Sequence, residues 1–240
     1  MKNIKYLLLL FIIILISGCG ADGGAAKLEQ ALENMSKISS AKIETEMNVA
    51  IEGYNIVMVI EEVVSENGES YTKNSTKMLG QENYNETYVI KNDDKILVYS
   101  GVNGKEWTYK MYDNVGMNNN STPGGISSFA SNYKSVKEVN SDIKGHTKLE
   151  VTIDKNEMAK KLDGEVGDVK FKLAKDLVMD VYIKDDYITK IKFNFEDSLQ
   201  TSEDGTKTKY SFEFNISEHN NISDIDVPQE ILEQAKEASE

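Results

Sequence analysis

The chain is poor in the residues on which disulfide bonds and metal centres depend. It has one cysteine, two histidines and no arginine among 240 residues. A single cysteine cannot form a disulfide bond within the chain, so the fold must rest on its hydrophobic core. His146 and His219 stand among polar residues, with no second histidine or cysteine at ligand spacing. We interpret both as solvated loop residues and predict no metal and no other cofactor.

Signatures of catalysis are also missing. The sequence contains no Gly-x-Ser-x-Gly elbow and no glycine-rich phosphate loop followed by Lys-Ser/Thr. The acidic pairs Asp93-Asp94, Asp185-Asp186 and Glu203-Asp204 lack the spaced ligands of a calcium loop and fit hairpin turns better. We therefore predict no catalytic residue and expect a protein that is not an enzyme. An anchored hydrolase is the weakest of the alternatives.

The charge of the chain is strongly one-sided. Its 40 acidic residues outnumber 27 lysines, which gives a formal net charge of −13. An acidic domain is repelled by nucleic acid, so we exclude that class of partner. It is also repelled by anionic lipid headgroups, so a basic patch cannot be what holds it at a membrane.

The N-terminus has the three parts of an export signal. Lys2 and Lys5 form a charged region, residues 6–16 are apolar, and Ser17-Gly18 are small residues before a cleavage point. The apolar run is about half of the roughly 20 residues that a membrane-spanning helix needs. We therefore predict that residues 1–18 are a signal peptide and not a transmembrane anchor.

The only cysteine lies at the predicted cleavage point. Ile16-Ser17-Gly18-Cys19 resembles the lipobox of bacterial lipoproteins, and this resemblance implies that Cys19 carries diacylglycerol. The alternative is an ordinary secretory signal with a chance cysteine. Residues 19–26 are small and glycine-rich and predict a flexible tether. The expected location is the cell membrane, with the domain lipid-anchored on the extracytoplasmic face, where a partner would be the membrane or an envelope protein.

The rest of the chain predicts one α+β domain over residues 27–240. Apolar residues at helical spacing indicate an amphipathic helix over 27–38, and a long series of segments then alternates with a period of two. Such alternation indicates an antiparallel sheet with one buried face, and no βαβ rhythm is present. We expect shorter helices at 126–133, in 154–176 with Asp154 as the N-cap, and after Pro228, where Ile231, Leu232 and Ala235 share a side.

Large flexible apolar side chains recur on the predicted inward faces of the strands. Methionine suits a surface that accepts irregular ligands, whereas plain core filling is the alternative for each residue taken singly. A long sheet with few covering helices leaves room for a hydrophobic ligand in its concavity. The candidate cavity residues are Met47, Val49, Met58, Trp107, Met111, Met179, Phe193 and Phe212.

Three segments carry a resemblance to a known family. Ser39-Ser40-Ala41-Lys42-Ile43-Glu44, the hairpin over 182–193 and the ending Asp226-Val227-Pro228-Gln229-Glu230-Ile231 are similar to Gram-positive members of the LolA/LppX-like lipoprotein superfamily. The resemblance implies a strongly curved antiparallel sheet, an incomplete barrel, with helices covering its concave face. It also implies an apolar cavity that binds an acyl chain or lipid. The alternative is an interaction or sensing module of the cell envelope with a filled core and no ligand.

Overall fold

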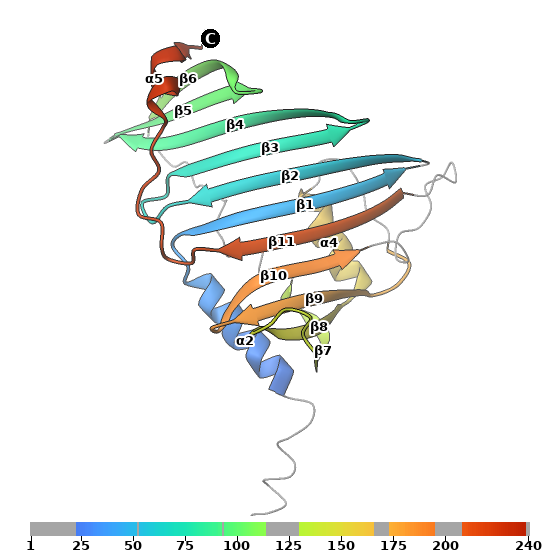
Figure 1. The fold of residues 1–240 in the computed structure, drawn as a ribbon. Helices are drawn as coiled ribbons and strands as arrows, with labels where there is room; N and C mark the ends of the chain where they lie inside the picture. Colours follow the sequence, from blue (N-terminus) through green and yellow to red (C-terminus); the bar gives the residue numbers. More distant parts are fainter. Residues whose placement is uncertain are drawn as a thin grey trace, which may run out of the picture.

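Most of the described chain forms one large sheet (Figure 1). The computed structural model describes residues 23–51, 53–92, 94–113, 130–165, 173–194 and 208–238. The helices of these residues are α2 (Gly23–Ser36), α4 (Lys155–Glu165) and α5 (Gln229–Gln234). The strands are β1 (Ala41–Ile51), β2 (Tyr54–Val64), β3 (Ser70–Met78), β4 (Gln81–Asn92), β5 (Lys95–Val102), β6 (Lys105–Asp113), β7 (Tyr133–Val139), β8 (Thr147–Ile153), β9 (Leu177–Lys184), β10 (Tyr187–Asn194), β11 (Thr208–Ser217) and β12 (Lys236–Glu237).

The strand order shows two antiparallel series joined in the middle of the sheet. The order is β12-β6-β5-β4-β3-β2-β1-β11-β10-β9-β8-β7. The chain folds from β1 to β6 towards one edge, resumes at β7 on the other edge, and returns until β11 pairs with β1. The predicted turn at Asp185-Asp186 lies at the β9–β10 hairpin, where the two residues adopt φ values of 51° and 62°. Positive φ at both central residues is what a two-residue hairpin loop requires. Asp93 and the pair Glu203-Asp204 lie outside the described residues.

The main core lies between α2 and the half of the sheet that contains β7–β11 and β1. The helix buries Leu28, Ala31 and Met35 against this half. Its first turn approaches closely: a Cβ added to Gly24 would lie 3.3 Å from Val136 and 3.4 Å from the Glu138 amide nitrogen. Met158 of α4 is buried in the same cluster. We call the side of the sheet that carries α2 the helix face.

A second, smaller core lies on the opposite face. Tyr88 and Trp107 are buried there with Ile231 of α5. The register assigns the face: Tyr88 is paired with Tyr71, Tyr71 with Val63, and Val63 with Lys42, whose neighbour Ile43 points into the main core. Directly paired residues share a face and successive residues alternate. The expectation that all helices cover one face is therefore wrong for α5.

Residues 218–228, which we call the C-terminal strap, connect the two cores. They run beside the strand ends from β11 towards α5 (Figure 1). The Asn220 amide donates to the Ser40 carbonyl oxygen (2.8 Å), and the Ile222 amide donates to Ser40 Oγ (3.1 Å). Further along, the Ile225 amide donates to Oε2 of the buried Glu69 (3.2 Å). This segment therefore fastens the ends of β1 and β3 before α5 reaches the opposite face.

The sequence pattern predicted most strands and missed others. The period-two segments correspond to β1, β8, β9, β10 and β11, as expected. The expected helix over 126–133 is wrong at its end, because Tyr133 begins strand β7; its residues 126–129 lie outside the described chain. Helix α2 begins at Gly23, so residues 23–26, for which we expected a flexible tether, are helical.

Candidate ligand-binding face

Most of the predicted cavity residues lie on the helix face. Met58, Met47, Phe212 and Phe193 are cross-strand partners in one row across β2, β1, β11 and β10. Met179 pairs with Val151, which is buried in the main core. Val49, also buried, follows Met47 by two positions on the same face of β1. These six residues therefore share one face of the sheet.

Burial divides this group into core and open positions. Met179, Phe193 and Phe212 are buried in the main core, and the rings of Phe193 and Phe212 are stacked with centroids 5.1 Å apart. Met47 is half-buried against them, and Met58 on β2 is also half-buried. The row thus runs from a filled core under α2 towards the part of the helix face that α2 does not reach.

Two predicted cavity residues are not with the others. Trp107 is 5% exposed and belongs to the second core, on the opposite face of the sheet. Met111 is 56% exposed and lies on the same opposite face. Its partner on β5 is Leu97, which also pairs with Ile90. Leu97 and Ile90 each lie two residues from the Tyr88–Tyr99 pair, so all of them share the face of the second core. The prediction that Met111 points inward is wrong. Alternating residues define the two faces of a strand. They do not show that the two faces of β3–β6 pack against different parts of the chain.

The helix face of β2–β5 remains partly open. It carries exposed apolar side chains: Ile60 is 36% exposed, Met78 47% and Val102 50%. The pairs Ile56–Met78, Met58–Thr76 and Val102–Asn85 place these side chains on the same side as Met58. We call this surface, the helix-face side chains of β2–β5, the open face. Ile60 and Val102 stand at the two ends of one cross-strand row, with Asn74 and Asn85 between them.

The polar residues of the open face are almost all uncharged. Thr72, Thr87 and Ser100 form one cross-strand row, and Asn74 pairs with Asn85 in the next. Glu62 stands at the β2 end of the first row, and Lys91 lies at the strand end, where its Nζ donates to the Asn67 carbonyl oxygen (2.7 Å). The open face can therefore accept an apolar group beside hydroxyl and amide groups without desolvating many charges.

The opposite face of the same strands is charged. Lys73 pairs with Glu86 and Lys77 with Glu82 across β3 and β4. The Tyr71 hydroxyl donates to Glu86 Oε1 (2.8 Å), and this contact together with burial raises the pKa of Tyr71 well above its usual range. The Nζ of Lys73 lies 4.6 Å from the centroid of the Tyr84 ring. The opposite face of β3 and β4 thus carries paired charges beside the second core, whereas the open face has few charged residues.

The described residues also form an open pocket at the β6 edge. It has a volume of about 580 Å³ and is lined by Glu106, Trp107, Thr108, Glu233, Gln234 and Lys236. It lies between β6 and the segment formed by α5 and β12. Of the predicted cavity residues only Trp107 lines it, and the other five lining residues carry charged or polar groups.

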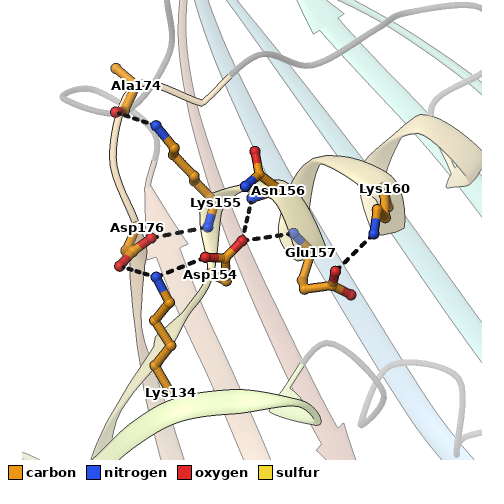
Figure 2. A network of polar contacts seen from close by, with 8 residues as sticks. All are labelled: Lys134, Asp154, Lys155, Asn156, Glu157, Lys160, Ala174 and Asp176. Carbon is orange, nitrogen blue, oxygen red and sulfur yellow. Dashed lines mark hydrogen bonds and ion pairs between the residues drawn. The ribbon is translucent and has the colours of Figure 1, made fainter.

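The densest group of charged residues stabilises the start of α4 (Figure 2). Lys134 Nζ lies 2.7 Å from Asp154 Oδ2 and 2.9 Å from Asp176 Oδ2. Asp154 Oδ1 accepts the amide N–H groups of Asn156 (2.8 Å) and Glu157 (3.3 Å), which confirms it as the N-cap. Its bonds to Lys134 and to these amides lower the pKa of Asp154 to about 2. Each carboxylate is already paired, so this group is a structural clamp.

The histidines and acidic groups form no metal site among the residues that the structure describes. His219 is half-buried, which corrects its interpretation as a solvated residue. Its ring stacks on Tyr187 with centroids 4.9 Å apart, and Nε2 lies 3.3 Å from the Ile188 carbonyl oxygen. Burial lowers the pKa of His219. It packs the start of the strap against the β9–β10 hairpin.

Cys19, the predicted lipidation site, lies outside the described residues. None of the helices in the described part of the chain has the length and apolar character that crossing a bilayer requires.

Comparisons with known proteins identify likenesses of structure alone. No protein-family model and no curated relative matches the chain. Among solved structures, LprF from Mycobacterium bovis is 13% identical with a TM-score of 0.49, over 87% of this chain and 99% of that one. A LolA superfamily protein from Nitrosomonas europaea is 11% identical with a TM-score of 0.27, over 87% of this chain and 96% of that one. Because both scores are below 0.5, we base no argument about the site on them.

Proposed function

We propose that this chain is a membrane-anchored lipoprotein of the extracytoplasmic surface that binds a lipid or another hydrophobic molecule without catalysis. The observation that carries the proposal is the open face, where Ile60, Met78 and Val102 remain exposed beside uncharged polar residues. Burying such side chains contributes roughly 25 cal/mol per Å² of apolar surface, which favours a ligand that covers several of them. The lipobox-like sequence at Cys19 supports the membrane location.

The position of Met58 supports the same surface. It continues the row of Met47 and Phe212 out of the filled core and onto β2. Methionine adapts its shape to irregular apolar groups, so Met58 is suited to contact a ligand at the border of the core.

The test is binding of a fluorescent fatty acid, cis-parinaric acid, to the mature chain. Met58→Lys should reduce its affinity at least tenfold, because a charge would lie at the border between the core and the open face. Val59→Lys is the matched control, since Val59 is the next residue of β2, is also half-buried, and points to the opposite face. Equal binding by wild type and both variants, with unchanged unfolding, would contradict the proposal.

A second candidate function is an interaction module with no ligand. The filled core under α2 favours it. Wild-type protein that ignores the fatty acid, and from which organic extraction recovers no lipid, would favour this alternative.

A further inference from the structure

The lipid anchor would be attached to one edge of the sheet. Helix α2 crosses the helix face from the β1 side to β7, and its N-terminal end lies at the β7 edge (Figure 1). The close approach of Gly24 to Val136, Glu138 and Leu149 fixes this end against β7 and β8. The ion pair between Lys27 Nζ and Glu138 Oε2 (2.8 Å) fastens the next turn.

The chain between the anchor and this edge is very short. Cys19 precedes Gly23 by four residues, which span at most about 14 Å even when fully extended. The sheet is much larger than this reach. From β7 to β2 there are six strand intervals, or about 29 Å along the sheet at roughly 4.8 Å each. The tether therefore brings the β7 edge to the bilayer and leaves the β2–β6 half beyond its reach.

The charges at the two ends of the sheet favour the same orientation. Lys137 on β7 and Lys144 in the following loop are exposed, and neither has an ion-pair partner in the described part of the chain. The acidic residues of the same segment are engaged: Glu138 pairs with Lys27, and Asp142 accepts the Tyr182 hydroxyl and lies 3.9 Å from Lys148 Nζ. At the other end, α5 and β12 carry Glu230, Glu233 and Glu237 with a single lysine, Lys236. An anionic leaflet attracts lysine and repels glutamate, so it should draw the β7 edge down and push the α5 end away.

We propose that the β7 edge and the β7–β8 loop (residues 140–146) are the surface that contacts anionic lipid headgroups, so that the sheet stands upright on the membrane. This inference rests on the lipid anchor of the proposed function. The open face then lies above the headgroups and faces the envelope. A lipid bound there has left the bilayer completely, and its exchange takes place with a partner on the outer side of the protein.

The test measures energy transfer from the anchored protein to acceptor-labelled lipid. The full chain, lipidated at Cys19, is placed in phosphatidylcholine–phosphatidylglycerol vesicles that contain rhodamine-phosphatidylethanolamine. A donor dye is attached at Ser135→Cys on β7 or at Lys105→Cys on β6, both exposed positions. We expect several-fold more efficient transfer from position 135 than from position 105. Equal transfer, or the reverse order, would overturn the orientation.

The role of the lysines has its own variant. Lys137→Gln with Lys144→Gln should reduce the difference between the two dye positions, whereas Lys77→Gln with Lys110→Gln, two exposed lysines of β3 and β6, should not. If Lys137→Gln with Lys144→Gln leaves the difference in energy transfer between positions 135 and 105 unchanged, these lysines do not orient the protein. If the protein does not float with the vesicles, the lipid anchor itself is contradicted. If the wild-type protein does not bind the fatty acid, the ligand-binding role of the open face is contradicted. Both failures are distinguishable from a wrong orientation, which changes only the energy transfer.

Discussion

The indole of Trp107 lies directly over Gly101. A Cβ built on Gly101 would come within 2.6 Å of two ring atoms of Trp107. The ring also lies against Tyr88, whose centroid is 6.0 Å away, and is buried in one cluster with Ile231. Glycine at position 101 is thus what allows the only tryptophan of the chain to lie flat on β5.

Gly101→Ala should therefore destabilise the protein by about 1–3 kcal/mol, the usual cost of overpacking a core. Urea unfolding followed by Trp107 fluorescence measures both the stability and the environment of the ring. Gly23→Ala is the control, because a Cβ on Gly23 meets nothing within 4 Å. Equal stability of the two variants would contradict the packing of Trp107.

Two methionines of the predicted cavity should differ sharply in their importance for stability. Met179 is fully buried in the main core, so Met179→Ala should lower the free energy of unfolding by about 2–5 kcal/mol. Met111 is exposed on the opposite face, so Met111→Ala should change it by less than about 0.5 kcal/mol. Chemical denaturation of both variants checks this. Similar losses would mean that the face assigned to Met111 is wrong.

The clamp at α4 should make stability depend on pH in the acidic range. Folding lowers the pKa of Asp154 from 3.8 to about 2, so its stabilising effect is complete above pH 3.8 and is lost as the pH falls towards 2. Wild type should exceed Asp154→Asn in stability at pH 6, and this difference should shrink between pH 4 and 2. Urea midpoints measured across this range test it.

Asn156→Ala is the control for this titration. Asn156 lies two residues after Asp154, is exposed, and has no titrating side chain. Its difference from wild type should stay constant with pH. A constant difference for Asp154→Asn as well would show that Lys134 does not hold the carboxylate in the folded protein.

The sequence predicts a strand and its buried face well where apolar residues are confined to one face of that strand. Ile43, Met47 and Val49 alternate with charged or polar residues, so the buried face of β1 could be assigned without a structure. In β2 the run 56–60 is apolar on both faces, and nothing local shows which of its two sides belongs to the open face. Strand β7 has only two aliphatic residues, Val136 and Val139, and was missed for that reason.

The helix start at Gly23 was missed for a related reason. Paired glycines have low helix propensity and predict a flexible segment. Here packing overrides propensity, because the first turn of α2 lies so close to β7 and β8 that a Cβ on Gly24 would be tightly packed against Val136 and the Glu138 amide. The placement of α5 on the opposite face depends on the strap contacts of Ser40 and Glu69, which join residues far apart in the sequence.

Two neighbouring residues of α5 test that placement. Ile231 is buried against Tyr88 and Trp107, whereas Leu232 is 44% exposed, although the sequence predicted that both share the apolar side. Ile231→Asp should place an unpaired carboxylate against the rings, detach α5 and shift the emission of Trp107 to longer wavelength. Leu232→Asp should leave the emission and the unfolding midpoint near wild type. If the two variants behave alike, α5 does not cover Trp107; if only Ile231→Asp exposes the ring, the C-terminal helix is what completes the second core.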